Sequence, residues 1–274
     1  MDLTSDHPFW FVQNGLLRTH PPIEEDQSCD VAIVGAGITG AIVAHRLASR
    51  GLSVVVLDRR DVCTGSTCAS TALIQYEIDV PLVEMAEKIG KEKAERAYRL
   101  SYESIDRIDE LVASSSIDCG FERKISIYLA PEESKRSLLE QEAEARTSCG
   151  IPVRLLDKEQ LAEQHSLRGC AALVSQQAAS CDPYRLAHGL LENAIRQGAK
   201  VFDRTSIDDW EPDALGVRLT TNRGPAVSAR NVVFATGYEA HSMLREKVVD
   251  LRSTYAVVSQ PLPSLGSWNA DWMM

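Results

Sequence analysis

The residues whose types and spacing most clearly predict chemistry form one glycine-rich turn, Gly35, Ala36, Gly37, Ile38, Thr39 and Gly40. This GxGxxG pattern directly follows the apolar run 30–34 (DVAIV) and opens a helical pattern over 38–49. The first glycine allows a tight turn, the second lets a pyrophosphate approach the backbone, and the third lets the helix pack closely on the strand. Phosphates would then lie at the helix N-terminus, where free N–H groups point. Short glycine patterns also occur in turns that bind nothing.

An acidic residue, Asp58, ends the next apolar run, 53–57 (SVVVL), and strengthens the binding interpretation. An acid at this place accepts hydrogen bonds from the adenosine ribose hydroxyls. It also disfavours a 2′-phosphate and therefore NADP, although Arg59 and Arg60 keep that cofactor open. Strand, helix and strand in this order predict a βαβ unit with a parallel pair, and so a Rossmann-like α/β fold that binds an ADP-containing dinucleotide.

A segment rich in small hydroxyl residues follows, with candidate contacts at Gly65, Ser66, Thr67, Ser70, Thr71 and Ala72. Hydroxyl and backbone groups of this kind can donate to a pyrophosphate or to the edge of a flavin ring. The same composition is also typical of a solvated serine-rich loop. Further along, 232–237 (VVFATG) is an apolar strand pattern that ends in a turn.

Five segments occur in a characteristic order: DVAIVGAGITGA, VVVLDRR, GSTCASTALIQYEID, CDPYRLAHGLLENAIRQGAKV and NVVFATGYEA. In this order and spacing they resemble the D-amino acid oxidase family of FAD-dependent oxidoreductases, which includes glycine oxidase, sarcosine oxidase and D-amino acid dehydrogenase. The resemblance extends from about Phe9 onward. It implies an FAD cofactor and oxidation of the C–N bond of an amino acid or related amine, by hydride transfer to the flavin, to an imine that hydrolyses to an oxo acid.

The resemblance also implies individual roles. The three loop glycines line the FAD pyrophosphate, Asp58 holds the ribose, and Arg59 and Arg60 lie near the adenosine. The serine-rich segment runs under the pyrophosphate towards the flavin ring, although family members often carry glycines where this chain has 68–72. The backbone at Ile207 meets the adenine, and the strand end closes on the dinucleotide through Ala235, Thr236 and Gly237. No catalytic residue and no metal ligand is assigned.

Hydrophobic periodicity predicts how the chain is divided. Residues 1–29 are expected to form an irregular arm, and 30–80 with 181–240 the FAD-binding domain. An inserted α+β substrate region, 81–180 with 241–274, completes the expected organisation. The predicted elements outside the βαβ unit are a helical segment over 84–112 broken at Gly90, helices at 131–149 and 183–197, the second capped by Asp182, and strands at 124–130, 151–156, 200–202, 217–221, 231–235 and 254–259.

Composition limits the classes of partner. The chain has 29 Lys and Arg against 39 Asp and Glu, a formal charge of −10, which argues against nucleic acid. Its seven cysteines include no CxxC pair and are typical of reduced thiols. We find no signal peptide and no apolar run long enough to span a bilayer. These features predict a soluble cytoplasmic protein. The family resemblance implies a small-molecule amino acid or amine substrate, and the oligomeric state is left open.

By the same resemblance, a complete family member would continue past residue 274 with further substrate-domain strands and a glycine-rich FAD segment. We therefore expect a truncated member whose active site is incomplete. Two alternatives remain open on the sequence: a non-catalytic dinucleotide-binding protein, and an NAD-linked dehydrogenase.

Overall fold

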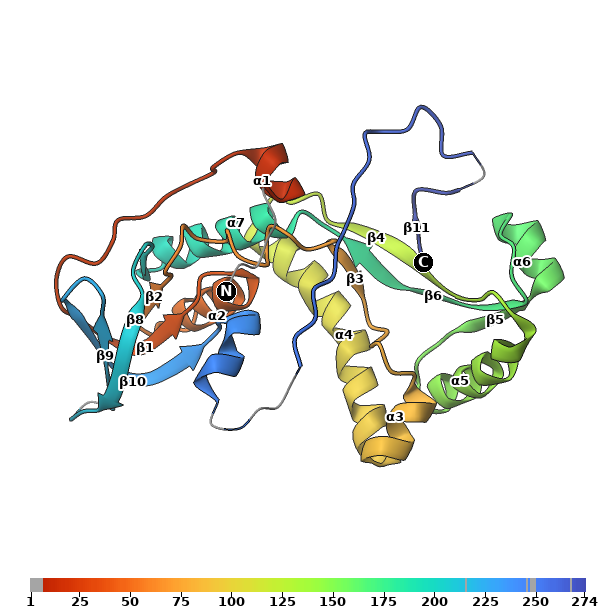
Figure 1. The fold of residues 1–274 in the computed structure, drawn as a ribbon, viewed down its shortest axis with the longest axis horizontal. Coiled ribbons are helices and arrows are strands. Elements are labelled where there is room, and N and C mark those ends of the chain that lie inside the picture. Colours follow the sequence, from red (N-terminus) through yellow and green to blue (C-terminus); the bar gives the residue numbers. More distant parts are fainter. Residues whose placement is uncertain (1–6, 215, 245, 247–249, 267) are drawn as a thin grey trace. The chain divides into compact units, whose positions relative to one another are not determined.

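The computed structural model describes residues 7–214, 216–244, 246, 250–266 and 268–274. The chain divides into two compact units. The first unit comprises 1–71, 115–119 and 182–258, and the second comprises 72–114, 120–181 and 259–274. Each unit contains one β-sheet with helices packed on it (Figure 1).

The first unit is built on a six-stranded sheet in the order β7-β2-β1-β10-β9-β8. Its strands are β1 (Gln27–Val34), β2 (Val54–Leu57), β7 (Lys200–Phe202), β8 (Ile207–Pro212), β9 (Val217–Thr221) and β10 (Ala226–Phe234). Strand β1 pairs in parallel with β2 and β10, and β2 pairs in parallel with β7. Every residue of β2 is buried, as expected of a strand covered on both faces of a parallel sheet. The α/β class and the parallel pair predicted from the sequence are confirmed.

Two helices of the first unit, α2 (Ile38–Ala48) and α7 (Pro183–Arg196), pack against each other. Small buried residues of α2 allow this close approach: Gly40, Ala41, Ala44 and Ala48. Helix α7 begins as the sequence predicts. The Asp182 carboxylate accepts the N–H groups of Tyr184 and Arg185, both at 3.0 Å, and Pro183 occupies the first helical position.

The N-terminal arm differs from the expected irregular segment. Residues Phe9–Asn14 form a short helix, α1, and β1 begins at Gln27 rather than at residue 30. A helix this short needs tertiary contacts, and the Trp10 indole N–H supplies one by donating to the Ser70 carbonyl at 2.9 Å. The strand predicted over 254–259 is also wrong: this segment has no regular structure, and Tyr255 is 82% exposed.

The second unit has a five-stranded sheet in the order β11-β4-β6-β3, with β5 also paired to β6. The strands are β3 (Leu73–Gln75), β4 (Glu122–Ala130), β5 (Arg154–Asp157), β6 (Ala171–Ser180) and β11 (Trp272–Met273). Strand β6 pairs antiparallel with β3, β4 and β5 and is therefore the centre of the sheet. The sequence prediction missed it, together with β3, β8 and helix α6 (Lys158–His165).

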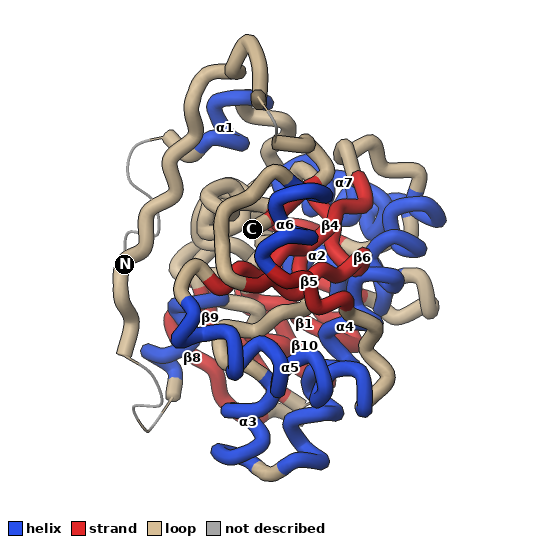
Figure 2. The backbone as a smooth tube through the Cα atoms, turned by 90° about the vertical axis from the view of Figure 1, so that its right-hand side faces the viewer, coloured by secondary structure: helices blue, strands red, loops and turns tan. Residues whose placement is uncertain are grey.

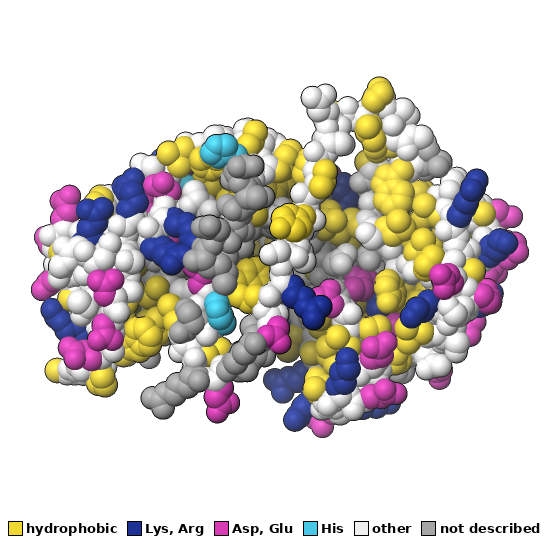
Figure 3. Space-filling view, viewed as in Figure 1, with side chains coloured by type: hydrophobic (Ala, Val, Ile, Leu, Met, Phe, Trp, Pro, Cys, Tyr) yellow, Lys and Arg dark blue, Asp and Glu magenta, His cyan; other side chains and the backbone are white. Residues whose placement is uncertain are grey.

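Three helices of the second unit, α3 (Leu82–Ile89), α4 (Lys91–Ser115) and α5 (Arg136–Ser148), lie where the sequence predicts helical segments. Gly90, at φ +89°, separates α3 from α4, as expected of the predicted break. Helix α5 follows a single 3₁₀ turn, Glu133–Lys135, and packs beside α3 (Figures 1 and 2). On the face drawn in Figure 3, side chains of both charge signs are interspersed rather than segregated.

One buried histidine makes the stability of the first unit depend on pH. His188 on α7 is 4% exposed, and its ring packs edge-on against Tyr184 with centroids 4.5 Å apart. Its Nε2 atom has no hydrogen-bond partner within the described ranges. Burial, together with the smaller effects of the neighbouring His20 and Arg18, lowers the pKa of His188 from 6.5 to about 4.

We expect His188 to destabilise the fold as the pH falls from 6.5 towards 4. In this range the unfolded chain takes up a proton that the folded chain does not, so the free energy of unfolding decreases by up to about 3 kcal/mol. Urea unfolding at several pH values measures this slope. His188→Leu should flatten it, whereas His241→Leu, a change at an exposed histidine, should not. Equal slopes in wild type and His188→Leu would contradict the prediction.

Candidate functional site

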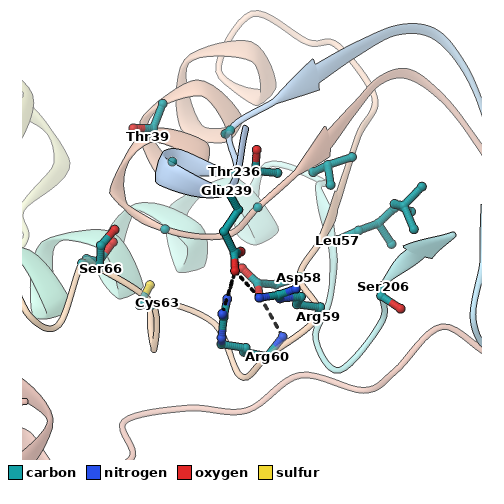
Figure 4. A pocket seen from close by; sticks show the side chains of 18 of the residues that line it. Thr39, Leu57, Asp58, Arg59, Arg60, Cys63, Ser66, Ser206, Thr236 and Glu239 are labelled. Carbon is teal, nitrogen blue, oxygen red and sulfur yellow. Dashed lines mark hydrogen bonds and ion pairs between the residues drawn. The ribbon is translucent and has the colours of Figure 1, made fainter. Parts of the chain in front are cut away.

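A cleft of about 230 Å³ opens in the first unit, where the carboxyl ends of β1, β2 and β10 meet the N-terminus of α2 (Figure 4). Ligands of open α/β sheets bind at this edge. Of the residues predicted from the sequence, the cleft brings together Gly35, Gly37, Ile38, Thr39, Asp58, Arg59, Arg60, Gly65, Ser66, Thr67, Ile207, Ala235, Thr236 and Gly237. It is not lined by Ala36, Gly40, Ser70, Thr71 or Ala72.

Two glycines of the loop are required by the packing of the chain itself. A Cβ atom on Gly35 would lie 2.4 Å from the carbonyl oxygen of Ala235, and one on Gly40 would lie 1.9 Å from the carbonyl oxygen of Gly35. Gly35 also has φ +107°, a backbone conformation that residues with a side chain rarely adopt. The loop therefore fits against the end of β10, and helix α2 fits against the loop, only without side chains at these positions.

Gly37 differs because its missing side chain leaves space at the cleft. A Cβ atom there would lie 2.9 Å from Thr67 Oγ1, and Gly37 itself lines the cleft. Thr67 Oγ1 accepts the N–H of Ile38 at 3.0 Å and so satisfies one amide of the first turn of α2. The remaining first-turn N–H groups have no acceptor within the helix, and the positive end of the helix dipole points the same way. This arrangement favours an anionic group such as a pyrophosphate.

Asp58 fastens the glycine loop to the end of β2. Its Oδ2 accepts the N–H of Ala36 at 2.7 Å and its Oδ1 accepts the N–H of Arg60 at 2.9 Å. Burial raises the pKa of Asp58 against the opposing effect of these two N–H bonds and of the Arg60 guanidinium. Each carboxylate oxygen keeps further acceptor capacity, which suits ribose hydroxyls. Ala36 thus does not line the cleft, but its N–H group helps to hold the Asp58 carboxylate in place.

Several cleft residues were missed by the sequence analysis. Those additional to the predicted set are Val34, Leu57, Cys63, Thr205, Ser206, Glu239 and Met243. Glu239 lies on the 3₁₀ helix η2 (Gly237–Met243), just after the recognised ATG segment, and its carboxylate pairs with Arg59 and Arg60. The proximity of Glu239 to ATG was the one available signal, but nothing in the pattern shows that its side chain turns back into the cleft.

Cys63 is buried beside the loop and is chemically quiet. Its Sγ donates to the carbonyl oxygen of Ala36 at 3.2 Å. Burial raises the pKa of the Cys63 thiol well above its ordinary value, so the neutral thiol persists. A thiol in this state is a packing group rather than a nucleophile.

Two other properties concern the described part of the chain as a whole. No helix in it has the length and apolar character needed to cross a membrane. Within the same ranges, no group of three or more His, Cys, Asp or Glu side chains is placed to hold a metal ion.

The residues of the cleft fit an ADP-containing dinucleotide. Gly37 leaves the space in which a backbone can approach a pyrophosphate, and the first turn of α2 supplies N–H donors beside it. Asp58 supplies acceptors at the end of the neighbouring strand. This combination is the donor and acceptor set that such a cofactor needs.

Comparison with known proteins gives the family. Residues 30–273 match the family model DAO, described as FAD dependent oxidoreductase. The putative Rieske 2Fe-2S iron-sulfur protein YhfW of Bacillus subtilis is 30% identical over 69% of this chain and 36% of that protein. The probable oxidoreductase OrdL of Haemophilus influenzae is 25% identical over 88% of this chain and 58% of that protein.

The solved structure of glycine oxidase from Geobacillus kaustophilus superposes with a TM-score of 0.62 at 26% identity, over 78% of this chain and 57% of that one. The chain thus spans between about a third and three fifths of the length of these relatives. The family match confirms the resemblance drawn from the sequence, and with it FAD as the cofactor of this class of enzyme. This chain belongs to the DAO family of FAD-dependent oxidoreductases.

Proposed function

We propose that this chain forms the FAD-holding part of an oxidoreductase that oxidises the C–N bond of an amino acid or related amine to an imine. The observation that carries the proposal is the cleft at the N-terminus of α2, lined by both Gly37 and Asp58, in a chain of this family. The named activities of several relatives support an amine substrate. They include glycine oxidase of Geobacillus kaustophilus and gamma-glutamylputrescine oxidoreductase of Escherichia coli.

The residues of the cleft divide the work of holding the cofactor. The first turn of α2 would donate N–H groups to the pyrophosphate, and Thr67 accepts the Ile38 N–H of that turn. Asp58 would accept from the ribose hydroxyls while it holds the loop through Ala36. The backbone at Ile207 would meet the adenine, and residues 235–237 line the cleft just beyond the end of β10.

FAD, when bound, accepts two electrons and a proton as a hydride from the carbon that bears the amine. The chain's own contribution would be to hold FAD through the first turn of α2 and Asp58. Release of the amine proton and addition of water to the imine then give an oxo acid and ammonia or an amine. We assign no residue to the substrate carboxylate.

The test is flavin analysis of the purified chain followed by anaerobic reduction. We expect about one FAD per chain. Loss of the flavin absorption band when glycine, sarcosine or another amino acid is added without oxygen would support amine oxidation, and it would contradict the expectation from the sequence that the active site is incomplete. Glycerol 3-phosphate is the comparison substrate, because glycerol 3-phosphate dehydrogenases are also among the relatives. If only glycerol 3-phosphate causes loss of the flavin absorption band, the proposed C–N oxidation is wrong and oxidation of a C–O bond replaces it. FAD that no amine reduces would indicate a non-catalytic binding protein.

A further inference from the structure

An ion-pair cluster of Arg59, Arg60 and Glu239 lines the cleft next to Asp58. Glu239 Oε1 lies 3.0 Å from Arg60 Nη2, Glu239 Oε2 accepts from Arg60 Nη1 at 3.3 Å, and Arg59 Nη2 contacts the same carboxylate. Figure 4 shows Glu239 pointing from η2 towards both guanidinium groups, next to Asp58. The Glu239 side chain is only 18% exposed, so the pairing is partly shielded from solvent.

The cluster is electrically balanced. Burial raises the pKa of Glu239, but the hydrogen bond from Arg60 and the charges of Arg60 and Arg59 lower it more, to a net value below its ordinary one. Glu239 is therefore a carboxylate at neutral pH. With Asp58, the group has two positive and two negative side chains.

Two arginines at the end of β2 are the residues that would otherwise recognise a phosphate. The planar guanidinium group matches phosphate oxygens in charge and geometry. Arg59 and Arg60 follow the ribose-binding position Asp58 directly, which is why the sequence alone leaves a 2′-phosphorylated ribose open. The structure shows that both guanidiniums already hold the carboxylate of Glu239.

We propose that Glu239 is a specificity-determining residue, which occupies Arg59 and Arg60 so that the cleft accepts an adenosine nucleotide with a free 2′-hydroxyl and excludes one with a 2′-phosphate. The inference rests on the proposed function, since it assumes that the cleft holds FAD. A 2′-phosphate would have to displace Glu239 from two ion pairs and then lie near two carboxylates. Like charges brought together in this way oppose binding strongly.

The test uses the FAD-loaded full chain and the fluorescence of FAD released by two competing nucleotides, 5′-ADP and 2′,5′-ADP. The measured quantity is the ratio of the concentrations that release half of the FAD, because this ratio cancels any change in the affinity for FAD itself. In the wild type, the half-release concentration of 2′,5′-ADP should be at least about tenfold higher than that of 5′-ADP. In Glu239→Gln this ratio should fall by about tenfold or more.

Two further variants make the result specific. Glu211→Gln removes a charge from an exposed glutamate on β8 that does not line the cleft, and it should leave the ratio unchanged. Arg60→Gln added to Glu239→Gln should restore the discrimination. If Glu239→Gln leaves the ratio at the wild-type value while both nucleotides release FAD, the inference is overturned and the cleft assignment stands. If the chain holds no FAD at all, the proposed function fails first and the inference falls with it.

Discussion

Replacing the buried Arg146 with methionine is expected to lower the free energy of unfolding by about 3–5 kcal/mol. Arg146 lies on α5 and is 1% exposed. Its Nε donates to Glu142 at 2.8 Å, and its Nη1 donates to the Tyr76 hydroxyl at 3.1 Å and to Glu77 at 3.3 Å. Methionine fills similar space but leaves two buried carboxylates without their cation, and it is this uncompensated charge that destabilises the second unit.

The surroundings of Arg146 increase the expected effect. Its guanidinium carbon lies 5.4 to 5.9 Å from the ring centroids of Tyr76, Tyr98 and Tyr128, a distance at which a cation is attracted to an aromatic face. Glu142 also accepts the N–H groups of Leu82 and Val83, at 2.8 and 3.0 Å, which begin helix α3. Loss of Arg146 therefore weakens the attachment of α3 as well as that of α5.

Urea unfolding monitored by circular dichroism measures this prediction. Arg136→Met is the matched control, because Arg136 is on the same helix and pairs with the exposed Glu140. It should cost no more than about 0.5 kcal/mol. The double variant Glu142→Gln with Arg146→Met should lose less free energy of unfolding than the sum of the losses in the two single variants. The reason is that each single change leaves the opposite charge buried without its partner, whereas the double change removes both charges. A difference of less than 1 kcal/mol between Arg146→Met and Arg136→Met would count against a buried ionic network.

Replacing Gly40 with alanine is expected to remove both stability and flavin. The added methyl group would lie 1.9 Å from a backbone oxygen of Gly35, which cannot rotate away as a side chain can. We expect the free energy of unfolding to fall by more than about 3 kcal/mol, at the upper end of overpacking effects. The FAD content per purified chain should fall with it, because α2 can no longer lie against the loop.

Gly37→Ala is the informative companion to this change. Its Cβ would meet only the Thr67 side chain, at 2.9 Å, so the direct effect on stability should be smaller. Adding Thr67→Ala removes that contact and should make the two changes together less costly than their sum. FAD content should stay low in the double variant, because the methyl group still lies where the pyrophosphate approaches. Recovery of FAD would show that Gly37 serves the loop and not the cofactor.

The elements that could be predicted from the sequence are those whose pattern is local. The βαβ unit is specified by two buried apolar runs and the glycine turn between them. Strands β7 and β9 have the bounds that the sequence predicts, 200–202 and 217–221. Strand β6 is different, because its sequence AALVSQQAAS has few β-branched residues, and its conformation is decided by three partner strands. The segment 254–259 shows the converse: it has the residues of a strand, but no strand forms there.

The candidate site shows the same division. The glycine loop and Asp58 can be recognised from the sequence because their spacing along the chain is characteristic. The pairing of Glu239 with Arg59 and Arg60 depends on where η2 returns in space, some 180 residues later, and no periodicity contains that information. The motif predicts that Gly35 serves the turn and Gly40 the packing of the helix, and the structure adds which atoms a Cβ would meet there, the carbonyl oxygens of Ala235 and Gly35.

The parallel pairing of β1 with β10 has a consequence for synthesis. Val31 lies opposite Asn231, so the partner of β1 is made about 200 residues after it. At roughly 5–20 residues per second, the ribosome needs about 10–40 s to deliver it. Throughout that interval β1 can pair with β2, but the backbone N–H and C=O groups of its other edge stay without their strand partner. We therefore expect co-expression with a chaperone that binds extended apolar segments to raise the yield of folded protein.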